Sequence, residues 1–390
     1  MVNKKKSQIL VCIIYVSLGV CFSEGLFFKV NIFFPYFPAF LITVLMITTV
    51  AATQNAVSKK AINLASILTS LFLIFSLPFL VVGKAFNTLG YLQLNVFLLL
   101  TIFLRYSLFP SSQMTTIRKA LLFWFYIQCA FVFLGVVSWE LFRVDLNFLS
   151  PLPEIRDIIA FRPAGLSREP AWAALNISIT MLGVAKTHAK KNLKPLFILY
   201  VTCIYLLQSM TGLILALTLF ATEFRLFEKG SSVSQGHRRA LRYGVVIILI
   251  VAALIANSPR IANIATLSDA STNMRVSSFL VALEVINENG LFGVGYGNFR
   301  EHAAYGFMFD NFIDLENIVN YKSDSSFLNL WAEIGVFGIF LACLFTKTLT
   351  IDKTTFMFSV MILLLFGTII VPSILILALI SGLRLKNDRK

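Results

Sequence analysis

Three arginines and one aspartate are the side chains of this sequence best suited to chemistry. Arg162 and Arg168 lie in the stretch FRPAGLSREPAW, Arg275 opens RVSSFLVALEVINENGLFGVGYGNF, and Asp324 lies in KSDSSFLNLWAEIGVFG. Planar guanidinium groups bind oxyanions through paired hydrogen bonds, so arginines near a membrane surface suit phosphate or pyrophosphate. A carboxylate such as Asp324 can act as a general acid or base. These residues predict a site for an anionic substrate.

A purely structural interpretation of the first stretch stays open. Arg168 could pair with the neighbouring Glu169, while Arg162 reaches toward lipid headgroups. Pro170 suits the first position of a helix, and Glu169 suits the positive end of the helix dipole. Gly165 provides a turn between the two arginines, so that both can face one anionic group.

A glycine-rich stretch follows an expected helix in the second region. From Arg275 onward, apolar residues such as Phe279 and Leu283 recur at helical spacing, which predicts an amphipathic surface helix that ends near residues 289–290. The next residues could offer backbone N–H groups to an anion or form a flexible turn. The substrate-binding candidates of this stretch are Gly293, Gly295, Tyr296, Gly297 and Asn298. Their setting excludes a Rossmann dinucleotide fingerprint.

Asp324 and Ser325 precede an apolar run. Asp324, Ser325 or Ser326 could cap the helix that follows, and Ser325 is also a candidate substrate ligand. Glu333, nine residues further on, is an acid within an expected membrane span, which is a functional hypothesis by default. Arg105 also lies in an expected span, and its position near one end favours snorkelling to the surface.

The composition predicts a membrane protein. Hydrophobic residues make up 58% of the chain and charged residues 13%, and the mean hydropathy is +0.82. A soluble domain has about 25% charged residues. We expect an all-α polytopic membrane protein, a single integral membrane domain over 1–390 with about 12 transmembrane helices. The predicted spans are 9–26, 31–52, 62–83, 91–109, 120–139, 171–186, 195–208, 211–227, 243–257, 327–346, 354–370 and 372–384. The connection QSMTG (208–212) could also be a kink within a re-entrant pair.

Charge predicts the orientation. With both termini in the cytoplasm, 22 of the 33 basic residues and only 4 of the 19 acidic residues fall on the cytoplasmic side. This asymmetry matches the positive-inside rule. Topology thus accounts for the net charge of +14, and nucleic acid is not needed as a partner. Two large loops, 140–170 and 258–326, fall on the outer side, where loops of this length are usually functional.

Cysteine and histidine usage argues against a metal site. The five cysteines are scattered through apolar runs, and the three histidines are isolated, so no cluster has metal-ligand spacing. We expect neither a metal nor another cofactor. The basic and apolar N-terminus lacks a cleavage site and is expected to be an uncleaved first helix.

The order of these motifs resembles the bacterial O-antigen polymerase and O-antigen ligase superfamily over about residues 160–340. The resemblance rests on RPAGLSREPA, the break QSMTG, then NENGLFGVGYGNF and SDSSFLNLWAEIGVFG. Ligases of this superfamily usually carry a histidine, then Asn, Ser or Gln, nine residues and Gly-x-x-Gly. Here Asp324 replaces the histidine before Ser325, nine residues and Gly335-x-x-Gly338. That departure favours the Wzy-type polymerase.

The resemblance implies a membrane glycosyltransferase of the GT-C type that uses neither a nucleotide sugar nor a metal. Its substrate would be an undecaprenyl-pyrophosphate-linked oligosaccharide in the bacterial inner membrane, extended on the periplasmic side. It also implies membrane lipid contacts and a chain-length regulator protein as a partner. Two alternatives stay open: an O-antigen ligase that transfers polymer to lipid A–core, and a flippase for lipid-linked oligosaccharides.

The chemistry of such a transfer assigns roles to the charged residues. The leaving pyrophosphate gains negative charge, which Arg162 and Arg275 are expected to stabilise, with support from Arg168. Asp324 is the expected base for the acceptor hydroxyl. Glu169 is expected to orient one of the arginines or to favour the helix start.

Overall fold

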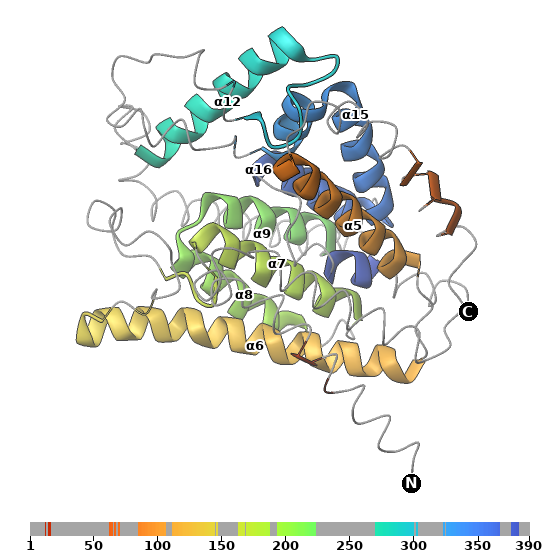
Figure 1. The fold of residues 1–390 in the computed structure, drawn as a ribbon. Coiled ribbons are helices and arrows are strands. Elements are labelled where there is room, and N and C mark those ends of the chain that lie inside the picture. The colour runs from red at the N-terminus through yellow and green to blue at the C-terminus, as the bar shows by residue number, and fades with distance from the viewer. Residues whose placement is uncertain are drawn as a thin grey trace, which may run out of the picture. The chain divides into compact units, whose positions relative to one another are not determined.

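The computed structural model is built of helices. It describes residues 85–106, 111–144, 163–167, 169–187, 193–223, 270–299, 325–366 and 376–381, and a few residues elsewhere (12, 15–16, 62–64, 66–67, 69–70, 146, 302 and 323). Within these residues there is no strand. The helices in Figure 1 are α5 (Ala85–Tyr106), α6 (Ser111–Phe142), α7 (Pro170–Thr187), α8 (Leu193–Leu207), α9 (Met210–Glu223), α12 (Ala270–Asn289), α15 (Ser326–Leu349) and α16 (Lys353–Leu365).

The chain divides into two compact units. The first comprises Met1–Ala56, Ser107–Asn257 and Pro372–Lys390, and it contains α6, α7, α8 and α9. The second comprises Val57–Tyr106 and Ser258–Val371, and it contains α5, α12, α15 and α16. The two units are described separately below.

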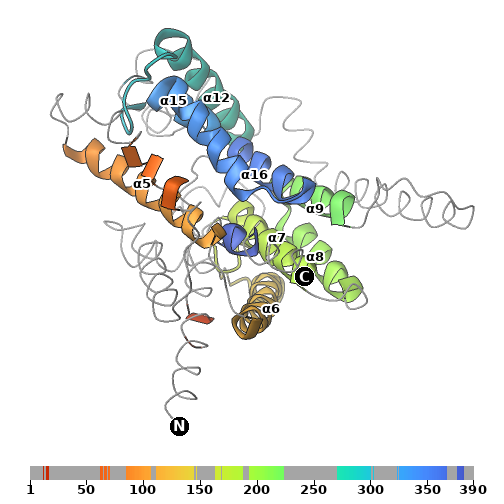
Figure 2. The ribbon, with the colours of Figure 1, turned by 90° about the vertical axis from the view of Figure 1, so that its right-hand side faces the viewer.

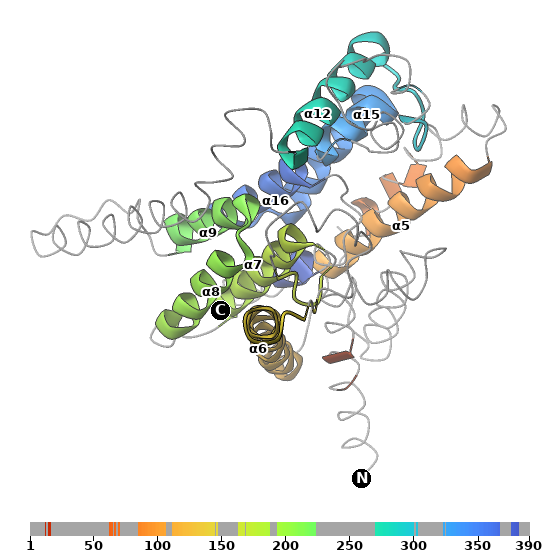
Figure 3. The same ribbon diagram turned by 90° about the vertical axis from the view of Figure 1, so that its left-hand side faces the viewer.

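Helix α7 is the centre of the first unit. Every residue from Trp172 to Val184 is buried, and the helix packs against α6, α8 and α9. In Figures 2 and 3, α7 lies between α6 and α9. Glycines permit the close approach: a Cβ at Gly212 would lie 2.7 Å from the Cβ of Ala174, and one at Gly183 would lie 2.8 Å from Ile380.

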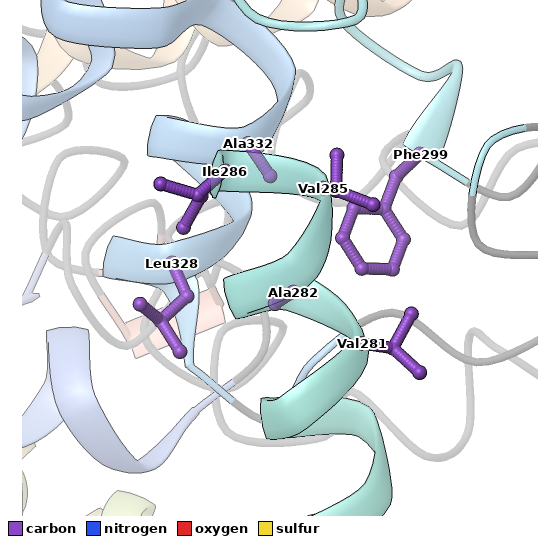
Figure 4. Close-up of a cluster of buried hydrophobic side chains, with 7 residues drawn as sticks. All are labelled: Val281, Ala282, Val285, Ile286, Phe299, Leu328 and Ala332. Carbon is purple, nitrogen blue, oxygen red and sulfur yellow. The ribbon is translucent and has the colours of Figure 1, made fainter. Parts of the chain in front are cut away.

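Helix α15 is the centre of the second unit, where it packs against α5, α12 and α16. Its contact with α12 is an apolar cluster, drawn in Figure 4. The cluster consists of Val281, Ala282, Val285, Ile286, Phe299, Leu328 and Ala332. Of the apolar face predicted for this helix, Ala282 and Ile286 pack on α15, whereas Phe279 and Leu283 are exposed.

Arg105 does not follow the snorkelling expectation. Only 6% of its surface is exposed, and its Nε donates a hydrogen bond of 3.0 Å to the carbonyl of Thr348 in the last turn of α15. A cation suits this position because the carbonyl end of a helix is negative. The C-terminal ends of α5 and α15 consequently lie side by side.

Seven predicted spans coincide with helices. The helix over 171–186 is confirmed and begins at Pro170, and the helix over 120–139 extends to Ser111–Phe142. Two described helices are long and apolar enough to cross a membrane, Thr115–Phe142 and Ser326–Leu349. The spans 9–26, 31–52 and 243–257 lie wholly or almost wholly outside the described residues. Within 62–83 only residues 62–64, 66–67 and 69–70 are described, all helical, and within 372–384 only 376–381. The number of twelve stays a prediction.

Candidate functional site

A buried turn carries the first candidate stretch. The N–H of Ser167 donates to the carbonyl of Ala164 at 3.0 Å, and Gly165 between them has a φ of 58°, which glycine adopts without strain. Ala164 and Ser167 are each only 2% exposed. Arg162 and Arg168, which lie just outside this turn, are outside the described residues.

A polar network ties this turn to α7 and α6. The Nδ2 of Asn176 donates to the hydroxyl of Ser167 at 3.0 Å. One turn further along α7, Thr180 accepts a 3.1 Å hydrogen bond from Gln128 of α6 and donates to the carbonyl of Asn176. All four side chains are at least nine-tenths buried. Because buried polar groups are costly to leave unpaired, this network holds the turn in one position.

Glu169 begins α7. Its carbonyl accepts a 3.0 Å hydrogen bond from the N–H of Ala173, and Pro170 follows as the first helical residue. This is the helix-start position that the sequence offered as one of two roles for Glu169. Its carboxylate role toward an arginine stays a prediction.

Two serines anchor the start of α15 on both sides of Asp324. Ser325 is the N-cap: its hydroxyl accepts from the N–H of Leu328 and donates to the carbonyl of Leu363 at 3.2 Å. Ser323 accepts a 3.2 Å bond from the N–H of Ser325 on its hydroxyl. Asp324 itself is outside the described residues. Since Ser325 already fills the cap, the helix start does not need Asp324 for that purpose.

Ser326 and Asn329 make further hydrogen bonds that hold the start of α15. The N–H and the hydroxyl of Ser326 both donate to the carbonyl of Phe366 just after α16. The Nδ2 of Asn329 donates to the carbonyl of Ser323 at 2.7 Å. The backbone on either side of position 324 is therefore held by α15 and the end of α16.

Helix α15 is broken in the middle. Ile334 has φ −128° and ψ 16°, and Gly335 has φ 63° and ψ −147°. Such a break removes hydrogen-bond partners from the carbonyls before it and from the amides after it. In α15 these groups find partners in another segment.

The glycine-rich stretch after α12 supplies those partners. The N–H groups of Val294 and Gly295 donate to the carbonyls of Ala332 and Glu333 at 2.9 and 2.8 Å, and the N–H of Val336 donates to the carbonyl of Leu291 at 3.2 Å. The indole of Trp331 adds a 3.1 Å hydrogen bond to the carbonyl of Gly290. We call residues 290–299, held in this way on α15, the clasp.

The spacing Gly335-x-x-Gly338 has a steric explanation. A Cβ at Gly335 would collide with the carbonyl of Leu291, and one at Gly338 would collide with the carbonyl of Leu330. Gly293 has a φ of 74°, and a Cβ there would lie 2.5 Å from the backbone of Glu333. Gly293 and Gly335 thus allow the clasp and α15 to approach each other, and Gly338 allows the two halves of the broken α15 to approach.

The clasp changes the interpretation of its candidate ligands. The N–H of Gly293 donates to Asn289 and that of Gly295 to Glu333, so in this structure neither is offered to an anion. Asn298 bonds within the clasp, through its N–H to Gly295 and its side chain to Val294. Tyr296 and Gly297 belong to the same segment, and their binding role stays a prediction. Trp331 and Asn176 were not predicted as functional residues, because their only signal was a polar atom within an apolar run.

One further candidate is placed by its backbone alone. Arg275 lies in the second turn of α12, on the helix that packs against α15. Among the described residues, no group of three or more His, Cys, Asp and Glu side chains could hold a metal ion.

Comparison with known proteins yields one match. A family model described as O-antigen ligase matches residues 195–343, from the start of α8 to within α15. The matched range includes α12, the clasp and the start of α15, whereas the turn at 163–167 precedes it. The searches of curated proteins and of solved structures found no significant match. The match over residues 195–343, together with the apolar helices, supports membership of this chain in the O-antigen polymerase and ligase superfamily of membrane proteins.

Proposed function

We propose that the chain is an O-antigen polymerase. It joins repeat units carried on undecaprenyl pyrophosphate into polysaccharide on the periplasmic side of the bacterial inner membrane. The observation that carries this choice within the superfamily is position 324. An aspartate stands where ligases usually have histidine, and the neighbouring Ser325 fills the cap of α15, which leaves the carboxylate for chemistry.

The transfer step follows from the proposed roles. Asp324 accepts the proton of the acceptor sugar hydroxyl as the hydroxyl oxygen attacks C1 of the donor glycan. The bond between C1 and the pyrophosphate oxygen breaks, and its electron pair leaves with that oxygen. Arg162 and Arg275 stabilise the charge that develops there, with Arg168 beside them. The products are a longer glycan on one lipid and free undecaprenyl pyrophosphate.

The anchored segments support these roles. The polar network on Asn176 holds the turn between Arg162 and Arg168, and the two serines hold the backbone beside Asp324. A catalytic group loses much of its effect when displaced by about 1 Å. Rigid support for two loops that carry the candidate residues is what such a site requires.

The ligase reaction is the second candidate. It is favoured by the description of the matching family model, O-antigen ligase. Donor and chemistry would be the same, but the acceptor would be lipid A–core. A flippase is the third candidate, and it would move lipid-linked oligosaccharide without making a glycosidic bond.

An assay with purified protein in liposomes distinguishes the polymerase, ligase and flippase functions. With lipid-linked repeat units as the only glycan, a polymerase produces a ladder of longer lipid-linked glycans. A ligase produces glycan transfer only after lipid A–core is added, and a flippase produces neither.

Arg162→Ala and Arg275→Ala should each abolish the ladder while the protein still inserts into the membrane. Ladder formation at a near-normal rate in both variants would contradict the arginine roles.

A further inference from the structure

We propose that Leu291 and Phe292, at the tip of the clasp, form a membrane anchor. In this proposal the two side chains lie among the outer carbons of the lipid acyl chains, and the lipid bilayer is the partner of this surface. The proposal does not depend on which glycan the protein transfers.

The two side chains are unusually exposed. Phe292 is 85% exposed and Leu291 73%, the highest values among the large hydrophobic residues that the structure describes. The clasp hydrogen bonds hold this tip. The carbonyl of Leu291 accepts from the N–H of Val336, and the N–H groups of Gly293 and Val294 donate to the carbonyls of Asn289 and Ala332. Adjacent exposed apolar side chains on a fixed backbone indicate a contact surface.

The exposed face of α15 continues this surface. Before the break, no residue of Ser326–Gly335 is exposed, whereas after it Val336, Phe340 and Cys343 are. Their spacing of four and three residues places them on one face of the helix. Lys347 continues the same face and ends the apolar stripe near the other end of α15. A lipid-facing stripe thus begins at the level of the tip.

Polar residues mark the opposite boundary. Asn287 and Glu288, one turn before the tip on α12, are exposed to the surroundings. An exposed carboxylate disfavours the hydrocarbon and suits the headgroup layer. Between Glu288 and Phe292 the exposed side chains therefore change from polar to apolar, while Phe279 and Leu283 are exposed apolar side chains earlier on α12.

Helix geometry gives the depth of the tip. Gly335, which faces Leu291, lies 14 residues before the end of α15 at Leu349. At a helical rise of ~1.5 Å this separation is about 21 Å, against a hydrocarbon core of about 30 Å. With Lys347 and Lys353 near one surface, the tip lies in the outer third of the core on the side of Ser326.

The clasp is suited to that environment. Irregular backbone in a membrane is tolerated only where its polar groups are paired within the protein. The broken helix and the clasp pair with each other through Val294, Gly295 and Val336. The mutual bonding satisfies groups that neither segment could satisfy alone.

Fluorescent labels at two positions test the proposal. A variant without the five native cysteines receives Phe292→Cys or, as the matched control, Glu288→Cys, and each is labelled with bimane in lipid nanodiscs. Quenching is measured with lipids that carry a doxyl group at carbon 5 or carbon 12 and with aqueous iodide. We expect the label at 292 to be quenched most by the carbon-5 lipid and protected from iodide, and the label at 288 to be quenched by iodide.

Two results would overturn the anchor. Equal iodide quenching at both positions would place the tip in water. Protection of position 292 from both lipid and iodide would show that protein covers it, either another part of the chain or a second copy. Thermal unfolding of each labelled variant shows that the compared proteins are folded.

Discussion

Single hydrogen bonds determine which residues are available for chemistry. Ser325, predicted as a substrate ligand, uses its hydroxyl to cap α15 and to bind Leu363. Asp324, for which capping was the competing role, has that role taken by its neighbour. On α7, Asn176 binds Ser167 and so supports the turn between two candidate arginines.

Asp324→Asn tests the base at this scale. Asparagine keeps the size and hydrogen-bonding capacity of the side chain but cannot accept the proton at neutral pH, so we expect glycan extension to fall by about 100-fold or more. The rate is measured with lipid-linked repeat units in liposomes at equal amounts of folded protein. Extension at the wild-type rate would leave Asp324 without a catalytic role.

Asn176→Leu tests the support of the arginine turn. Loss of a buried hydrogen bond costs about 1–3 kcal/mol, so we expect extension to slow by about tenfold or more. Thr202→Val is the control, because the Thr202 hydroxyl bonds only one turn back along α8, to Ile198. If Asn176→Leu lowered the melting temperature but left the extension rate of the folded protein unchanged, Asn176 would not position the turn.

At the scale of elements, hydropathy predicted the helices well and their interruptions poorly. The start of α7 at Pro170 and the end of α12 at Asn289 follow from local signals. The break of α15 at Gly335 was not predicted, because its freed backbone groups pair with residues 291–295, some forty positions earlier. Pairing between distant backbones leaves no periodic pattern, and only the glycine spacing pointed to it.

Gly335→Ala tests the break. Alanine there must adopt a φ of 63° and also collides with the carbonyl of Leu291, so we expect a loss of stability of several kcal/mol. Gly165→Ala is the matched comparison. Gly165 has a similar φ of 58°, but an added Cβ there would make only ordinary contacts, the nearest at 3.4 Å. This variant should lose about 1–2 kcal/mol of stability. Thermal unfolding in detergent compares them. Equal losses would mean that the clasp does not approach α15 this closely.

At the scale of the whole molecule, the distribution of charge predicts the orientation in the membrane, and the family match supports the proposed function. The excess of basic residues on one predicted side would account for the net charge of +14, and it predicts that both large loops lie on the other side. The candidate residues lie in both units, Arg162 and Arg168 in the first and Arg275 and Asp324 in the second. Sequence motifs indicated the superfamily, and the family match over 195–343 supports it. The acceptor depends on sugar contacts that neither motif spacing nor helix packing specifies.

A lipopolysaccharide gel of a strain that lacks this protein tests the central claim most directly. We predict lipid A–core that carries a single repeat unit, with the ladder of longer chains lost and restored by the wild-type protein but not by Arg162→Ala. Bare lipid A–core, with polymer retained on the lipid carrier, would contradict the account and identify a ligase.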